Sequence, residues 1–391
     1  MKKVQSRRIL SKETSIRSYR AGDEQEIVEL LEEAFNGWPK LTLESTASDH
    51  WKWKYVDIPK GDSMILVAEA DEIIGVVHSI PYKLKIEDHQ YNIHYIGDLV
   101  VHPAYRRHNV AKNMIEISIE ERRRRGIRFS YFVTSNPILI KYNLKMEGVQ
   151  VFPHKIVNMV RIRDIDKQLS AMPMKYGRLM KIGYVILDAL NKTSLQFQKE
   201  ENLGNIKVKR INKFHEEFDD FWQKMMSHYD FIVTRDAMWL NWRYCDPRAS
   251  GYQIIKAEKD SELVGYCVYI NNRYNPEYPV GYIVELLTLP GETKAASSLL
   301  REAVNYFNDN KVNIINCLTV KNHALKGVLA KQGFLDSRMP VYVFTSLIDF
   351  EDEFNKLRRL NGKKVYISYG DLDSLPVNIN ATGMARKAAS I

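Results

Sequence analysis

The sequence predicts an α/β protein, more narrowly α+β, with two similar domains in tandem, each a mixed central sheet flanked by helices. Three observations predict this fold class. The chain has 391 residues, enough for two to three domains of about 150 residues. Hydrophobic residues make up 45% and charged residues 27%, which is typical of folded globular proteins. Short segments also return in the same order about 190 residues later.

The repeat is carried by three sets of residues that keep their order and nearly keep their spacing. The sets are 53–57 (WKYVD) with 242–246 (WRYCD), 68–76 with 257–266, and Thr134, Asn136 and Gly148 with Thr319, Asn322 and Gly333. A period this long indicates two copies of one domain and not a solenoid, whose repeats are about 20 to 50 residues long.

The first domain opens with a short strand over 16–19 and a helix after Gly22 and Asp23. Asp is a preferred helix-capping residue, and apolar side chains then recur at helical spacing from Ile27 to Phe35. A second short helix is predicted over 49–56. Strands over 64–68 and 73–86 enclose an Ala-Asp-Glu turn and therefore predict a hairpin.

The remaining elements of this domain alternate between strand and helix. They are a strand over 93–101, a helix over 110–125, a strand over 129–134, a helix over 137–146 and a last strand opened by Gly148. This order places helices on a central sheet. We divide the chain into a first domain (14–160), a helical linker (161–205) with an amphipathic helix near 176–191, a second domain (206–348) that repeats the order, and a loop-rich tail (349–391).

Charge and composition favour an anionic binding partner and argue against a disulfide-rich, metal-binding, secreted or membrane-spanning protein. Lys and Arg number 57 against 48 Asp and Glu, and the net charge of +9 suits an anionic ligand, a nucleic acid or an acidic membrane surface. Cys245, Cys267 and Cys317 lie far apart, so neither a disulfide framework nor a metal site is expected. Residues 1–12 lack the apolar stretch of a secretory signal, and no apolar run approaches the roughly 18 residues of a membrane span. We expect a cytoplasmic protein.

The segment from Asp98 to Ala111 carries the clearest functional signal. A buried strand ends near Val101, the chain turns through basic residues, and a helix starts at Val110. Free N–H groups and the positive dipole end make a helix start an anion site. Asn109 falls at the tightest point, and asparagine tolerates left-handed backbone better than most residues. The residues alone fit either a phosphate-binding turn or an ordinary basic turn.

This segment resembles the acetyl-CoA-binding motif of the GNAT N-acetyltransferase superfamily. In that motif a strand ends in Val-x-Pro-x-(Tyr/Phe)-Arg and the chain continues (Arg/Gln)-x-x-Gly-x-(Gly/Ala). Here Arg106, Asn109 and Ala111 occupy the second part, with Asn109 in place of the first glycine. The resemblance covers 16–152 and, more loosely, 206–348, and it includes the order of the elements. The chain is thereby identified as a tandem-domain member of the superfamily.

The resemblance implies that acetyl-CoA binds where the fourth and fifth strands separate. The residues it assigns to the coenzyme are Leu99, Val100 and Val101 along the pantetheine arm, Arg106, Arg107, His108, Asn109, Val110 and Ala111 around the pyrophosphate, and Asn136 against the pantetheine.

The resemblance also implies two catalytic residues. Tyr142 would return a proton to the leaving thiolate, although the family's usual spacing to Gly148 falls on Leu144. Asp98, on the fourth strand, would be the base. These two residues and Asn136 each have a structural alternative: Asp98 only caps or pairs with an arginine, Tyr142 only packs, and Asn136 caps the helix that starts at Pro137.

Two further features bear on function. The basic run 122–125 closes a helix, where cations favour the dipole, so we interpret it as a solvated surface and expect no nucleic acid partner. The second copy has Pro290 and Glu292 where the phosphate turn should be; Pro lacks an N–H, and Glu repels phosphate. We therefore expect one coenzyme site per chain, in the first domain.

The leading hypothesis is an N-acetyltransferase, or other acyltransferase, that uses acyl-CoA and a small-molecule amine in a ternary complex, because no nucleophilic Cys or Ser motif is present. Two alternatives stay open. One is a non-catalytic CoA-binding or scaffolding pseudoenzyme, favoured by Asn109. The other is an acyltransferase for a membrane- or envelope-linked substrate, favoured by the segment 175–192, although membrane contact is not the preferred interpretation. The acceptor's identity and the oligomeric state stay open.

Overall fold

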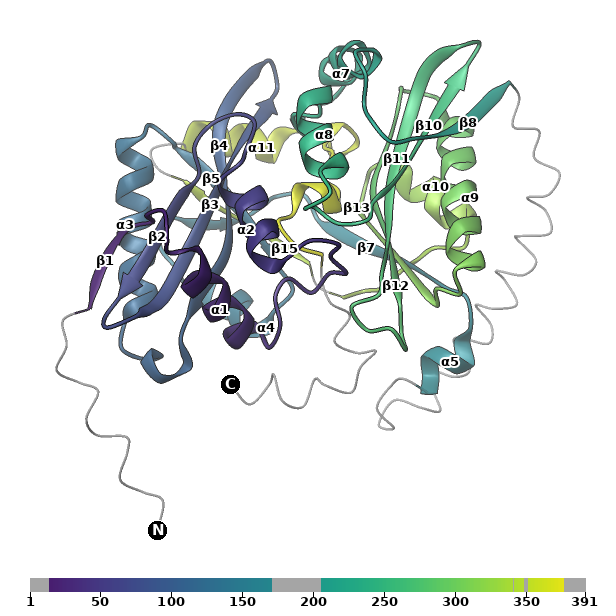
Figure 1. Ribbon diagram of the computed structural model, residues 1–391. Coiled ribbons are helices and arrows are strands. Elements are labelled where there is room, and N and C mark those ends of the chain that lie inside the picture. The colour runs from purple at the N-terminus through teal and green to yellow at the C-terminus, as the bar shows by residue number, and fades with distance from the viewer. Residues whose placement is uncertain (1–13, 171–204, 340, 348–350, 376–391) are drawn as a thin grey trace.

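A computed structural model describes residues 14–170, 205–339, 341–347 and 351–375. It contains two twisted mixed sheets that lie next to each other with helices around them (Figure 1). The predicted α/β class with two tandem domains is confirmed. The first sheet runs in the order β1 (Ser15–Ser18), β2 (Met64–Glu69), β3 (Ile73–Ile86), β4 (His89–Val101), β5 (Phe129–Thr134), β15 (Tyr342–Leu347) and β6 (Val149–Val151), and β9 (Phe231–Val233) pairs with the far end of β3.

The two faces of the first sheet are covered by different helices. Because strand side chains alternate, Leu66 and Val67 of β2 point to opposite faces. Leu66 belongs to a core with Met114 of α3 (Val110–Arg124). Val67 belongs to a core with Ile27 of α1 (Glu24–Phe35) and Trp51 of α2 (Ala47–Tyr55). The sheet is therefore buried on both sides.

The second sheet repeats this arrangement. Its order is β14 (Leu335–Asp336), β7 (Ile156–Ile162), β13 (Ile314–Val320), β12 (Val280–Thr288), β11 (Glu262–Asn272), β10 (Gln253–Lys259) and β8 (Ile206–Ile211). One face packs on α9 (Thr293–Asp309) and α10 (Leu325–Lys331). The other packs on α7 (Glu217–His228) and α8 (Ala237–Cys245), in the same core as α1 and α2. The other α-helices in the described part of the chain are α4 (Pro137–Asn143), α5 (Ile165–Ser170) and α11 (Glu351–Arg359).

The two halves exchange a strand. The sequence predicts one last strand after Gly148, but the chain forms β6, turns at Pro153 and continues as β7. β7 leaves the first sheet and lies between β13 and β14 of the second. In return, β15 lies between β5 and β6 of the first sheet. Boundaries at 160 and 206 therefore do not separate the two sheets.

Helices α2 and α8 end within the repeated WKYVD and WRYCD segments, and they meet between the halves (Figure 1). The rings of Trp53 and Trp242 stack with centroids 5.2 Å apart. Each indole N–H donates to the backbone oxygen of the other tryptophan, at 2.8 Å for Trp53 and 3.3 Å for Trp242. The contact is reciprocal, as expected when two copies of one domain are related by a pseudo-two-fold axis.

The C-terminal part differs from the loop-rich tail that the sequence predicts. Residues 351–359 form α11, and 365–372 are buried between the two sheets, where Figure 1 draws them in yellow. Short apolar stretches such as Val365 to Ile367 give no periodic signal, which is why the sequence does not reveal this segment. The linker helix expected near 176–191 lies outside the described residues.

Candidate active site

Strands β4 and β5 separate beside the start of α3. They are parallel, and their pairing consists of His94 with Ser130 and Tyr95 with Tyr131. Beyond Tyr95, β4 continues to Val101 while paired with β3 on its other side. A register shift there and the positive φ of Asp98 (34°) mark a bulge in β4. The result is a gap between β4 and β5 at the place that the resemblance assigns to the coenzyme.

The turn into α3 has the conformation that the sequence predicts. Asn109 is left-handed, with φ 62° and ψ 6°, and Arg107 also has a positive φ of 68°. Within the described structure the Asn109 side chain makes no capping hydrogen bond, and the first turn of α3 holds no acidic residue. The first N–H groups of α3 are therefore left for an anion. Arg106 turns back, and its Nε donates to the Val101 carbonyl at 3.2 Å, while Arg107 and His108 are exposed.

Asp98 is enclosed by hydrogen-bond donors from α2 and the loop before it. Its carboxylate accepts from Tyr55 Oη at 2.5 Å, Trp38 Nε1 at 2.9 Å and Lys54 Nζ at 3.1 Å. Burial alone would raise the pKa of Asp98, but Lys54 and the other donors lower it to about 2. A carboxylate held in this way is a poor proton acceptor, and the geometry favours a role in positioning Lys54 and Tyr55.

A second carboxylate, which sequence reasoning missed, reaches the same point from the C-terminal segment. Asp373 lies 3.5 Å from Lys54 Nζ, and its carboxylate packs so closely on Gly97 that a Cβ there would overlap it. Burial raises the pKa of Asp373, Lys54 opposes this rise, and Asp98 adds to it. No motif surrounds Asp373 in the sequence, so only the fold reveals it.

Asn136 and Tyr142, which the resemblance assigns to the site, lie at the start and near the end of α4. Asn136 caps the helix, because its Oδ1 accepts the Ile138 N–H at 2.9 Å, so the capping alternative is confirmed. Tyr142 is 48% exposed and Leu144 is 57% exposed. About half of the Tyr142 surface therefore faces solvent. Leu139, 46% exposed, adds apolar surface on this helix.

In the second half the corresponding gap is filled by the protein itself. β12 and β13 pair only as far as Ile283 with Cys317. Beyond that point Tyr366 from the C-terminal segment donates to Glu285 at 2.9 Å and accepts the Leu286 N–H at 3.3 Å. Little room therefore remains beside β12 for a pantetheine arm.

Glu285 corresponds to Asp98, since each follows a Tyr-Ile-x sequence on its strand. Tyr244 donates to it at 2.9 Å, as Tyr55 does to Asp98. Arg235 forms an ion pair with Glu285 at 3.2 Å, as Lys54 does with Asp98. Arg235 also lies 2.7 Å from Asp371 of the C-terminal segment. The duplicated tyrosine–carboxylate pair thus binds the tail in the second half.

The basic run 122–125 is only partly the solvated surface that the sequence suggests. Arg123, Arg124 and Arg125 are exposed, but Arg122 is 3% exposed. Its guanidinium donates to the backbone oxygen of Ser118 and to Ser130 Oγ of β5. Burial lowers the pKa of Arg122 to about 10. Arg122 faces the sheet because it lies eight residues, about two turns, after Met114 on the apolar side of α3.

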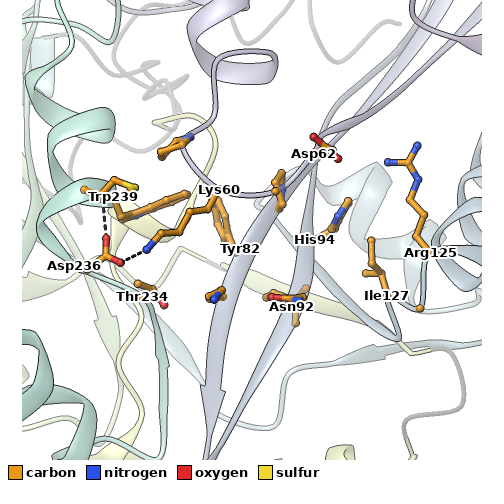
Figure 2. A pocket seen from close by; sticks show the side chains of 17 residues that line it. Lys60, Asp62, Tyr82, Asn92, His94, Arg125, Ile127, Thr234, Asp236 and Trp239 are labelled. Carbon is orange, nitrogen blue, oxygen red and sulfur yellow. Dashed lines mark hydrogen bonds and ion pairs between the residues drawn. The ribbon is translucent and has the colours of Figure 1, made fainter.

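A cavity of about 700 Å³ lies at the opposite end of β4, away from the start of α3 (Figure 2). The first half contributes residues of β3 and β4, including Tyr82, and the second half contributes Trp239 of α8. Lys60 spans the two halves through an ion pair with Asp236 at 2.8 Å.

Comparison with known proteins agrees with this architecture. The model of an "Acetyltransferase (GNAT) domain" matches residues 15–143, and that of the "Acetyltransferase (GNAT) family" matches 211–334. The chain belongs to the GNAT superfamily and carries two of its domains in tandem. A comparison with curated protein sequences finds no match.

Solved structures share the fold at low identity. A probable N-acyltransferase from Enterococcus faecalis has 12% identity and a TM-score of 0.57, covering 86% of this chain and 73% of its own. Saccharomyces cerevisiae N-myristoyltransferase with bound myristoyl-CoA and inhibitors has 12% identity and a TM-score of 0.58, covering 88% and 82%. A GCN5-related N-acetyltransferase from Kribbella flavida has 13% identity and a TM-score of 0.53, covering 86% and 72%.

Two further observations concern the described residues alone. No helix among them is long and apolar enough to cross a membrane. Within the same ranges, no three His, Cys, Asp or Glu side chains are grouped as metal ligands.

Proposed function

We propose that the protein transfers an acyl group from acyl-CoA to an amine, by direct transfer within a ternary complex. The observation that carries this proposal is the gap between β4 and β5 beside the uncapped first turn of α3. The GNAT assignment of both halves supports acyl-CoA as the donor. The first half is the proposed coenzyme site, because the gap of the second half contains Tyr366 and Asp371.

The residues of the first half fit the coenzyme. Backbone N–H groups of 107–111 would face the pyrophosphate, where Asn109 gives the turn its left-handed bend and Arg107 adds positive charge. The backbone of 99–101 would contact the pantetheine arm along the edge of β4 that β5 leaves. Asn136 would approach the same arm with its N–H₂ group, since its Oδ1 already caps α4.

In the proposed reaction the amine nitrogen attacks the thioester carbonyl carbon, the C–S bond breaks, and the amine proton leaves. Tyr142 would donate a proton to the departing thiolate. Of the two carboxylates beside the gap, Asp373 is the better proton acceptor, because its pKa is raised while that of Asp98 is lowered to about 2. Asp98 would hold Lys54 and Tyr55 in place.

We propose a small molecule or a peptide with a free amine as the acceptor. The likeness to N-myristoyltransferase supports the peptide alternative. The test is release of free CoA from acetyl-CoA in the presence of a panel of amino sugars, amino acids and short peptides. Acceleration of release by one class over the amine-free rate supports the proposal. Tight CoA binding without turnover across the panel would favour the pseudoenzyme alternative.

A further inference from the structure

His78 of β3 is a fully buried histidine beside the bulge of β4. Its ring lies between two groups whose hydrogen-bonding roles are fixed. Trp51 Nε1 donates to His78 Nε2 at 3.0 Å, and an indole N–H only donates. Nε2 is therefore bare, so the neutral ring carries its proton on Nδ1, which donates to the Asp98 carbonyl oxygen at 3.0 Å. Burial lowers the pKa of His78 to about 4, which keeps the ring neutral at pH 7.

The carbonyl that His78 binds belongs to the left-handed residue of the bulge. Two residues of β4, Asp98 and Leu99, lie opposite the single residue Val77 of β3. A bulge disrupts the ladder locally, leaves its extra residue unpaired and bends its strand. The hydrogen bond from His78 therefore supports the backbone of β4 at the point where the ladder does not.

The same imidazole also supports the side chain of Asp98. His78 stacks on Tyr55, with ring centroids 3.9 Å apart and planes inclined by 21°. Tyr55 in turn donates to the Asp98 carboxylate at 2.5 Å. His78 is therefore connected to both polar groups of Asp98, to the carbonyl directly and to the carboxylate through Tyr55.

The second copy of the domain lacks both the histidine and the left-handed carboxylate. Val268 corresponds to His78, because each lies three residues after the glycine that the two copies share, at 75 and at 265. A valine side chain has no hydrogen-bond donor. Glu285, the counterpart of Asp98, pairs with Val268 in the ladder, and its φ is not positive. Of the two copies, the one with the histidine is thus the one with the left-handed residue.

We propose that His78 is a positioning residue for the acyl-CoA site, because its Nδ1–H holds Asp98 in the left-handed conformation that sets the course of β4 along the gap. This inference rests on the proposed function. The backbone of 99–101, which is proposed to contact the pantetheine arm, follows Asp98 directly. A change in the dihedral angles of Asp98 therefore displaces these backbone groups, and binding sites tolerate only small displacements. The role of Nε2 is to fix the tautomer through Trp51.

Two variants separate the roles of the ring nitrogens. His78→Asn places an amide N–H₂ group near the position of Nδ1 and removes the acceptor for Trp51. His78→Gln places its amide near the position of Nε2 and removes the donor to Asp98. Each variant leaves one buried group unpaired, so both should unfold at lower urea concentration than the wild type. In calorimetric titration of the full chain, the Kd for acetyl-CoA should stay near the wild-type value in His78→Asn and rise at least about tenfold in His78→Gln.

The matched control is Trp51→Phe, which removes the N–H donor to Nε2 and keeps an aromatic ring. It should lower stability without changing the Kd for acetyl-CoA. An unchanged Kd in folded His78→Gln, or an equal rise in His78→Gln and either other variant, would overturn the inference. The proposed function would stand in those cases, because the wild type binds acetyl-CoA. Absence of binding by the wild type would instead overturn the proposed function, and this inference with it.

A measurement on the wild type tests the inference even if the histidine variants do not fold. Nitrogen NMR of the full chain with isotope-labelled histidine distinguishes protonated from bare ring nitrogens. We expect the proton of His78 on Nδ1 at neutral pH. We also expect the Nδ1–H resonance to shift when acetyl-CoA saturates the protein, because the carbonyl that it binds precedes the residues proposed to contact the pantetheine arm. A proton on Nε2, or a resonance that does not respond to bound acetyl-CoA, would overturn the inference.

Discussion

A carboxylate placed in the first turn of α3 tests the coenzyme site most directly. Ala111 is the second residue of this helix, and no acidic side chain lies in the first turn. Ala111→Glu should leave the protein folded, because an acid near a helix N-terminus interacts favourably with the dipole. It would, however, place a negative charge beside the pyrophosphate. Two such charges about 4 Å apart repel by about 4 kcal/mol at an effective dielectric of 20, and solvent screening reduces this value. We therefore expect the Kd for acetyl-CoA to rise by at least about tenfold, or about 1.4 kcal/mol.

The assay is calorimetric titration with acetyl-CoA, alongside a thermal melt that shows each variant is folded. Thr293→Glu is the matched control, because it adds the same charge to the exposed first residue of α9 in the second half. The affinity of Thr293→Glu for acetyl-CoA should equal that of the wild type, since the C-terminal segment fills the gap between β12 and β13 beside this helix. Unchanged affinity in folded Ala111→Glu, or an equal loss in Thr293→Glu, would refute the assignment.

Four further predictions follow from the same geometry. Titration of the wild type should give about one CoA per chain, and a value near two would contradict the blocked second gap. Tyr142→Phe should lower kcat by about 100-fold with little change in coenzyme affinity, and full turnover would remove Tyr142 from the mechanism. Turnover should fall as the pH drops through the raised pKa of Asp373, because a protonated carboxyl cannot accept a proton, and Asp373→Asn should remove this acidic limb from the kcat profile. Asp98→Asn should lower the free energy of unfolding by about 3–5 kcal/mol in urea titrations, since it leaves buried Lys54 without its closest anion. Asp373 offsets part of this loss. A change below about 1 kcal/mol would contradict the positioning role of Asp98.

Features encoded by neighbouring residues could be predicted from the sequence. The left-handed conformation of Asn109 follows from its place in a tight turn and from the tolerance of asparagine for that conformation. The hairpin of β2 and β3 follows from two apolar runs around a polar turn. The duplicated order of elements follows from the repeated segments. In the first two cases the signal and the structure lie within about 20 residues of each other, and in the third the signal is a set of segments repeated about 190 residues later.

Features that depend on which distant segments meet could not be predicted. The single strand that the sequence predicts after Gly148 does not reveal β7 as a second strand, and nothing in the sequence names the partners of β7 and β15, which lie in each other's sheets. Asp373 is one of many carboxylates in the sequence until the fold brings it to Lys54. Arg122 belongs to a run whose other members are exposed, and its burial depends on how α3 rotates against the sheet.

The second half contributes to the proposed coenzyme site of the first half. β15 pairs with all six residues of β5, from Phe129 to Thr134, so the strand that bounds the gap and carries Tyr131 is completed by the second copy. The segment that follows α11 fills the second gap with Tyr366 and then extends to bring Asp373 against Gly97 in the first. The C-terminal segment fills the gap of the second half and not that of the first. The second copy of the domain therefore acts as a scaffold for the first. The filled gap anchors the segment, and the anchored segment places Asp373 against Gly97 and Lys54 beside the first gap.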